Sequence, residues 1–205
     1  SAGPFWEARI SGLQPGTIYH YAVGNGLDHT FRTPPSPGTA AAFSVYVEGE
    51  IGQSVDEPAA GTIQSQIAAG APAFSLLLGD LTFADIHGQA AVDQHFNDVM
   101  VWSQDAAYMP AWGAHEWNDP LNDDLRNYKG RFDPPNPQAS AGAPGEGCCG
   151  EDWYWFDYGN VRFIAYPEPY VEPDTWADWN TSATELMDAA QADPAISYIV
   201  TFGHR

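Results

Sequence analysis

The chain has 205 residues, of which 27 are acidic and seven are basic, and its formal net charge at pH 7 is −20. Binding to a nucleic-acid backbone or to an anionic membrane surface needs clustered Lys and Arg, so the charge argues against both partners. Hydrophobic residues make up 44% of the chain, enough for a packed core. The longest apolar run, Phe74 to Leu78, is far too short to span a membrane.

The first part of the chain has the pattern of short β strands. Phe5–Ile10 and Ile18–Val23 are rich in β-branched and aromatic residues, and a turn separates them. Phe31–Thr33 then leads into the Pro- and Gly-rich segment Pro34–Gly38. A β-sandwich domain needs about seven strands. We therefore expect residues 1–34 to be the C-terminal strands of such a domain, residues 35–40 a linker and residues 41–205 a second domain.

Strands and helices alternate after the linker, which is typical of a layered α/β domain. The expected strands are Ala42–Val47, Ala73–Leu78, Met109–Trp112, Trp153–Tyr158, Val161–Ala165 and Ile196–Phe202. The expected helices are Thr62–Ala69, Ala90–Val101 and Thr184–Ala192. Gly159 and Asn160, between two of the strands, predict a hairpin. Asn118–Asn136 and Ser140–Gly150 are expected to be loops.

Four Gly-flanked acidic or histidine segments each follow an expected strand. They are Gly49-Glu50, Gly79-Asp80, Gly113-Ala114-His115-Glu116 and Gly203-His204. Side chains at the C-terminal ends of neighbouring strands converge on one edge of a sheet, and glycines there let backbone and ion approach closely. Turns after strands, with the two histidines in hydrogen bonds, would leave the same pattern. Four such segments in order favour a functional site at that edge.

These segments resemble the motifs of purple acid phosphatases, in the calcineurin-like metallophosphoesterase superfamily. Gly79–Asp85 is similar to Gly-Asp-Leu-Ser-Tyr-Ala-Asp, and Gly113–Glu116 is similar to Gly-Asn-His-Glu. Gly49–Ser54 resembles the first motif of the family, and Val200–Arg205 resembles the fourth, which ends in a ligand histidine. The spacings also fit, with 30 residues from Glu50 to Asp80 and 35 from Asp80 to His115.

The resemblance extends over nearly the whole chain. Tyr154–Ile164 looks like the hairpin of the family, and Leu13–Thr33 resembles the end of the fibronectin-type-III-like domain that precedes the catalytic domain in plant-type members. The resemblance implies a two-sheet sandwich flanked by helices, preceded by a few strands of a β-sandwich domain. The fifth family motif, Gly-His-x-His, would lie beyond Arg205, so we expect the second domain to be incomplete at its C-terminus.

The family resemblance implies a site with two metal ions that hydrolyses phosphate monoesters. One ion would be Fe(III) and the other Fe, Zn or Mn. By resemblance Asp80 would bridge the two ions, Glu50 would bind the first and His204 the second. His115 would be the catalytic and substrate-binding residue, in contact with the phosphate or the leaving group. Carboxylate and imidazole ligands suit such ions.

Three metal-contact positions depart from the family pattern. Glu50 replaces Asp, Phe83 replaces the Tyr whose phenolate gives the purple colour, and Ala114 replaces a ligand Asn. Neither Phe83 nor Ala114 has a side-chain donor for a metal. We therefore expect a degenerate site that is weak or inactive, binding one ion, two or none. Whether the protein is an enzyme or a pseudoenzyme stays open.

The alternative is a non-catalytic subunit of an extracellular complex or filament that reuses this fold. Strands missing from such a sheet would leave unpaired edges, and these edges favour self-association. The acidic composition suits a secreted, extracellular protein, although solubility alone also explains it.

Other features have weaker implications. His87 and His95 could bind metal or belong to a solvated helix face. The Trp-rich second half could form a carbohydrate- or partner-binding surface, or pack in the core. Cys148 and Cys149 are adjacent, so their pairing is open, and Asn180 begins a possible glycosylation tripeptide.

Overall fold

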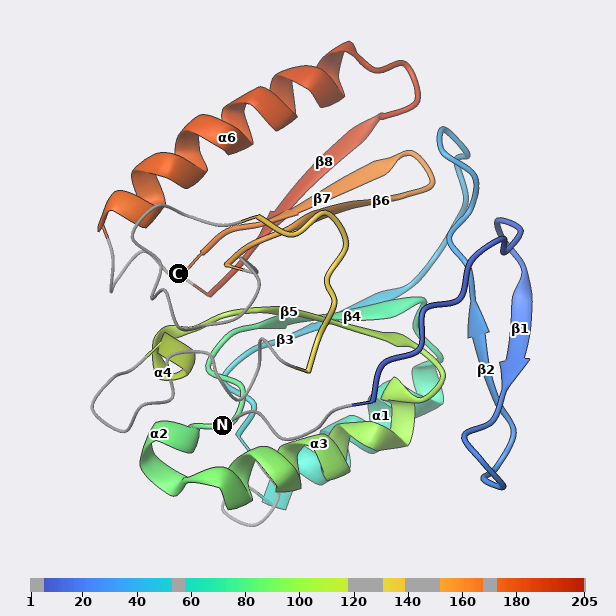
Figure 1. The fold of residues 1–205 in the computed structure, drawn as a ribbon, viewed down its shortest axis with the longest axis vertical. Helices are drawn as coiled ribbons and strands as arrows, with labels where there is room; N and C mark the ends of the chain where they lie inside the picture. Colours follow the sequence, from blue (N-terminus) through green and yellow to red (C-terminus); the bar gives the residue numbers. More distant parts are fainter. Residues whose placement is uncertain (1–5, 53–57, 118–130, 139–151, 168–172, 205) are drawn as a thin grey trace.

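The structure is a computed structural model that describes residues 6–52, 58–117, 131–138, 152–167 and 173–204. In Figure 1 two small sheets face each other, with helices on their outer sides and a separate two-stranded hairpin beside them. The architecture is therefore mixed α/β, as the alternation of strands and helices predicted.

The first sheet has three parallel strands in the order β3-β4-β5. They are β3 (Val45–Glu48), β4 (Phe74–Leu78) and β5 (Ala107–Ala111). Two helices, α1 (Pro58–Gly70) and α3 (Gln89–Ser103), connect them and cover the outer face of the sheet (Figure 1). Strand β4 is an almost continuously buried apolar run, as expected for a central parallel strand covered on both faces.

The second sheet has the order β6-β7-β8. Its strands are β6 (Trp155–Tyr158), β7 (Val161–Ala165) and β8 (Tyr198–Phe202). Strands β6 and β7 form an antiparallel hairpin, and β8 runs parallel to β7. The connection from β7 to β8 contains α6 (Pro173–Ala192), which lies on the outer side of this sheet (Figure 1).

Aromatic side chains fill the space between the two sheets. The ring of Phe74 from β4 lies 5.4 Å from that of Phe156 and 5.2 Å from that of Phe163, both in the second sheet. Trp179 of α6 is buried and donates a hydrogen bond from Nε1 to the carbonyl of Ala165, which ties the helix to β7. A second core of Ile67, Leu77, Val99, Trp102 and Trp112 lies between the first sheet and its helices.

The hairpin of β1 (Ile18–Tyr21) and β2 (His29–Arg32) docks on the turn between α3 and β5. The Tyr21 hydroxyl donates to the Gln104 carbonyl at 2.6 Å, and the Thr30 N–H donates to the Asp105 carboxylate at 2.8 Å. These contacts fix the hairpin against the body of the protein. The division into two domains joined at residues 35–40 stays a prediction.

The expected strands and helices are confirmed within a few residues, with three differences. The strand expected at Phe5–Ile10 is wrong, since residues 6–10 have no regular structure. The last helix begins at Pro173 rather than Thr184. Two helices of four residues each, α2 (Ala84–His87) and α4 (Ala114–Trp117), were not predicted, because one turn is too short to show a helical period. The expected loops at Asn118–Asn136 and Ser140–Gly150 lie mostly outside the described residues.

The helices of the described residues are all too short or too polar to cross a bilayer.

Phe74 provides a test of the packing between the sheets. The substitution Phe74→Ala removes an almost fully buried ring and leaves a cavity. We therefore expect the free energy of unfolding to fall by about 3–5 kcal/mol. Urea denaturation measures this loss. The control Ile86→Ala changes an exposed side chain and should cost less than about 0.5 kcal/mol. Equal effects of the two substitutions would contradict the core assignment.

Candidate metal centre

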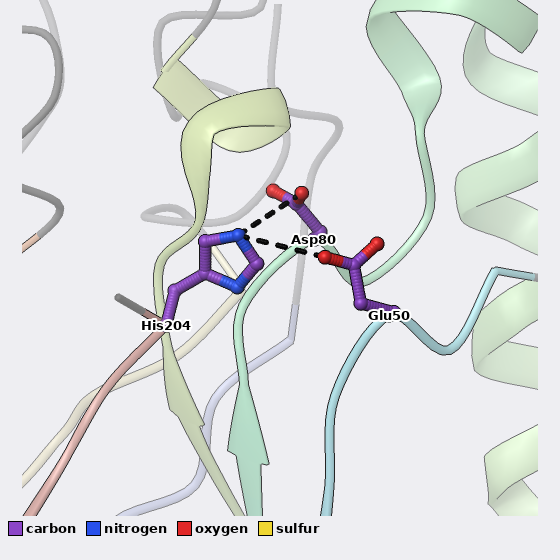
Figure 2. Close-up of side chains that lie close together, drawn as sticks. All are labelled: Glu50, Asp80 and His204. Atoms are coloured by element: carbon purple, nitrogen blue, oxygen red, sulfur yellow. Dashed lines mark ion pairs between the residues drawn. The ribbon is translucent and has the colours of Figure 1, made fainter.

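Three strand ends bring Glu50, Asp80 and His204 together. Glu50 follows β3, Asp80 follows β4 and His204 follows β8, so the group draws on both sheets (Figure 2). One ligand atom from each residue lies within 4.8 Å of the others. Among the described residues this is the one such group of His, Cys, Asp and Glu side chains. The carboxyl ends of the strands thus meet as the sequence pattern predicted, although the roles of the side chains as ligands stay a prediction.

Glycines allow the three loops to approach so closely. A Cβ atom on Gly79 would lie 2.6 Å from the backbone nitrogen of Gly113 and 2.8 Å from the Cβ of His204. A Cβ atom on Gly113 would lie 2.2 Å from the backbone nitrogen of Asp80. Contacts this short with backbone atoms cannot relax, so these two positions require glycine.

The backbone around the group is strained. Glu50, Asp80 and Phe83 have φ values of 55°, 49° and 53°, in the left-handed region that residues with a Cβ rarely adopt. Each such residue lowers the stability of the fold by about 1–3 kcal/mol. This backbone conformation persists only where surrounding interactions hold it. Three of them within one site mean that the surrounding contacts have to hold these loops in place.

Glu116 holds the strained turn after β4. This fully buried side chain accepts hydrogen bonds from the N–H groups of Asp80, Leu81 and Gly113, at 2.8, 2.8 and 2.7 Å. Burial raises the pKa of Glu116 to about 7, and the nearby Asp80 carboxylate adds to the rise, while the three N–H donors oppose it. Glu116 therefore acts as a clamp, which joins the loop after β4 to the loop after β5.

His204 directs its Nε2 at the Asp80 carboxylate. Its Nδ1 lies 2.8 Å from the carbonyl of Leu78, which can only accept, so Nδ1 carries the proton. Its buried Nε2 has no hydrogen-bond partner among the described residues and lies 3.1 Å from Asp80 Oδ2 and 3.7 Å from Glu50 Oε1. A nitrogen lone pair facing two carboxylates is repulsive unless a cation, either a proton or a metal ion, lies between them. The three side chains therefore fit a bound cation.

His115 lies beside this group and is oriented by Asp85. Its Nδ1 donates to the buried Asp85 carboxylate at 2.8 Å, and its Nε2 lies 3.9 Å from Asp80 Oδ2. The backbone N–H of His115 also donates to Asp80 Oδ1 at 2.9 Å. The ring of Phe83 lies 4.5 Å from the His115 ring. Helix α4 thus places His115 at the edge of the candidate metal centre with one ring orientation.

Asp85 and Glu116 are site residues to which the sequence alone gave no role. Both lie inside the matched motifs, Asp85 six residues after Gly79 and Glu116 three after Gly113. An acidic residue closing each motif was the available signal. Their function as partner of His115 and as clamp became visible only when the loops were placed in space.

The remaining candidates lie elsewhere. His95 is fully buried in α3 and hydrogen-bonds Gly52 and Tyr108, and burial lowers its pKa to about 4, so it is neither on a solvated face nor in the metal group. His87 is exposed at the end of α2. Ala114 is half-buried in α4, and Asn180 lies exposed within α6.

Four of the tryptophans that we considered as a surface are buried: Trp102, Trp112, Trp153 and Trp179. Cys148 and Cys149 lie outside the described residues.

Comparison with known proteins points to one family. No family model matches the chain. Over 116 residues, 56% of the chain, it is 32% identical to purple acid phosphatase 22 of Arabidopsis thaliana. Its fold is similar to that of purple acid phosphatase PPD1 from yellow lupin (Lupinus luteus) seeds, with a TM-score of 0.60 and 21% identity over 96% of the chain. The chain spans 25% of the Arabidopsis protein and 38% of the lupin chain.

Glu116 provides a pH-dependent test of the clamp. The pKa of about 7 in the folded state exceeds the value of 4.5 expected on unfolding, so the folded state holds more protons between these values. The resulting stabilisation is present below pH 4.5 and is lost as pH rises toward 7, by up to about 3 kcal/mol. We expect Glu116→Gln, which cannot ionise, to reduce the fall in unfolding free energy between pH 5 and pH 7, measured by urea denaturation in chelator. Equal pH slopes for variant and wild type would contradict the raised pKa.

Proposed function

Because the chain is a distant homologue of the purple acid phosphatases, we propose that it is part of a metal-dependent phosphoesterase that hydrolyses phosphate monoesters. In this proposal Glu50, Asp80 and His204 hold one cation, and His115 contacts the phosphate or the leaving group. The activity is expected to be weak, since the site departs from the two-metal pattern of the family.

The observation that carries the proposal is the position of the buried Nε2 of His204, which lies 3.1 Å from Asp80 Oδ2 and 3.7 Å from Glu50 Oε1. Its partner nitrogen is fixed by Leu78, so Nε2 faces Asp80 and Glu50 whatever occupies the space between them. Two carboxylates and one imidazole are ligands that Fe, Zn and Mn accept. A cation bound there would supply positive charge that polarises the phosphoryl oxygens.

The residues of the chain itself have separate tasks in this scheme. Asp85 holds the His115 ring through Nδ1, so that Nε2 is the atom that faces the substrate side. In the protonated ring Nε2–H can donate to a phosphate oxygen or to the leaving-group oxygen. The His115 N–H keeps Asp80 Oδ1 engaged, which leaves Oδ2 directed toward His204.

The same geometry explains why one cation is proposed instead of two. The described residues contribute three ligand side chains, and Asp80 would have to serve both ions. Phe83 and Ala114 add no donor atom. The Glu50 side chain is 62% exposed, so it is less fixed than Asp80 and His204. A second ion would need ligands from outside the described residues.

Metal binding tests the assignment directly. We expect Zn²⁺ or Mn²⁺ titrated calorimetrically into chelator-treated protein to bind at one site, with affinity at least about tenfold lower in Asp80→Asn and His204→Ala. The control is His20→Ala, which breaks an exposed His–Asp pair whose atoms lie 2.8 Å apart in the β1–β2 hairpin. Metal-dependent turnover of p-nitrophenyl phosphate should fall with the same two variants and not with the control. Unchanged affinity in both variants would refute the proposed ligands.

The alternative function is a non-catalytic subunit of an extracellular assembly, and the sheet edges support it. Within the described part of the chain β8 is an edge strand, with Tyr198 65% exposed and Val200 37% exposed, on alternate positions of the strand. Strand β3 is the corresponding edge of the first sheet and exposes Val47. Exposed apolar edges can pair with a strand of another chain.

Self-association distinguishes the alternative from the enzyme. If β8 pairs between copies, the wild type should form dimers or larger species in sedimentation equilibrium. Tyr198→Lys should shift it to monomers, because a charge on an edge strand opposes pairing. Ile86→Lys alters an equally exposed apolar residue outside both sheets and should have no effect. A wild type that stays monomeric at all concentrations contradicts the assembly alternative.

A further inference from the structure

A cavity of about 500 Å³ opens beside the candidate metal centre. It lies between residues 49–52 after β3, the first half of α1 and the segment from β4 into α2. Glu50, a proposed ligand, and Phe83, which contacts the His115 ring, both line it. A group attached to a phosphate at the metal centre would therefore have this cavity within reach. The volume falls in the range of small-molecule sites.

The walls of the cavity are mainly apolar. They are formed by Ile51, Ala59, Ala60, Ile63 and Phe83. Ile63 is 45% exposed on α1, so an apolar surface faces the opening. Apolar walls stabilise an apolar guest in proportion to the surface removed from water.

The polar part of the described lining offers no Lys or Arg to a bound anion. Its described polar side chains are those of Glu48, Glu50, Gln64, Thr82 and His87. Glu48 is held by Gln64, whose Nε2 donates to Oε2 at 3.0 Å, and Gln64 is itself fixed by a 2.6 Å bond from Trp102 Nε1. The second oxygen of Glu48, Oε1, is buried and has no hydrogen-bond partner among the described residues. With no Lys or Arg in the described lining to pair with it, and a net charge of −20 on the chain, an anionic organic group would be repelled.

We propose that this cavity receives the organic group of the phosphate ester and selects monoesters of apolar alcohols or phenols that carry no negative charge. The inference rests on the proposed function, because it takes the phosphate to be held at Glu50, Asp80 and His204. The cavity would reject esters whose organic group is itself anionic.

Binding of the organic group alone tests the cavity without any metal or turnover. The probe is 4-fluorobenzyl alcohol, titrated into chelator-treated protein and followed by ¹⁹F NMR. We expect Ile63→Glu to weaken binding at least about fivefold, because it removes apolar wall and adds a carboxylate. Gln66→Glu is the matched control, since it places the same residue on an exposed position of α1 outside the lining and should leave binding unchanged.

Turnover tests the selectivity. We expect kcat/KM for phenyl phosphate to exceed that for 4-carboxyphenyl phosphate at least about tenfold in 0.15 M salt, and Ile63→Glu to lower the value for phenyl phosphate. Turnover with equal kcat/KM for the two esters would overturn the inference and leave the proposed function standing. Probe binding that Ile63→Glu does not weaken would also overturn the inference, and turnover alone would then decide the proposed function. Probe binding that Ile63→Glu weakens, without turnover of either ester, would support the cavity and refute the proposed function together with the ester selectivity.

Discussion

The carboxylate of Glu116 connects the loops from which the candidate metal centre is built. It accepts N–H groups from the turn after β4, at Asp80 and Leu81, and from the turn after β5, at Gly113. In return Asp80 accepts the N–H of His115, so the two turns are joined in both directions. The left-handed backbone of Asp80 is unfavourable by itself, and this reciprocal bonding is what holds it in place. The position of Asp80 therefore depends on a residue that is not in the ligand group.

Carboxylate crowding is the electrostatic consequence of this geometry. Asp80 lies between Glu116 on one side and Glu50 with His204 on the other, in a protein of net charge −20. Burial and the Asp80 charge raise the pKa of Glu116, while the three N–H donors that it accepts lower it. No proton is needed between Asp80 and His204 if a metal ion lies there. A positive charge at Nε2, from a proton or a metal ion, would therefore offset the repulsion among these groups.

The sequence was sufficient for the strands after residue 17, for the hairpin at Gly159 and for the convergence of Glu50, Asp80 and His204, because the alternation of elements and the Gly-flanked strand ends carry that information. It was wrong for the short β-rich segment Phe5–Ile10, because residues 6–10 form no strand. It was insufficient for one-turn helices, which have no period, and so it missed how α4 presents His115. It also could not assign His95, since a histidine on a helix can be solvated or buried, and only the packing of α3 against the Gly52 loop decides between them. The role of Glu116 required a hydrogen-bond network that joins two separate loops.

The residues that match the family motifs do not all argue for catalysis with equal force. Gly79, Gly113 and Glu116 are needed for the loops to exist, whether or not an ion is ever bound. Their presence shows only that the fold is kept. His204 is different, because its bond to Leu78 uses Nδ1 and leaves the buried Nε2 facing the Asp80 carboxylate at 3.1 Å, where a proton or a metal ion has to lie between them. A buried nitrogen without a hydrogen-bond partner costs stability, so this pair requires a cation, which either a proton or a metal ion supplies. The pair of His204 and Asp80 is therefore stronger evidence for a bound cation than Phe83 and Ala114 are against one. Those two residues lack a metal donor, but they leave no buried polar atom without a partner.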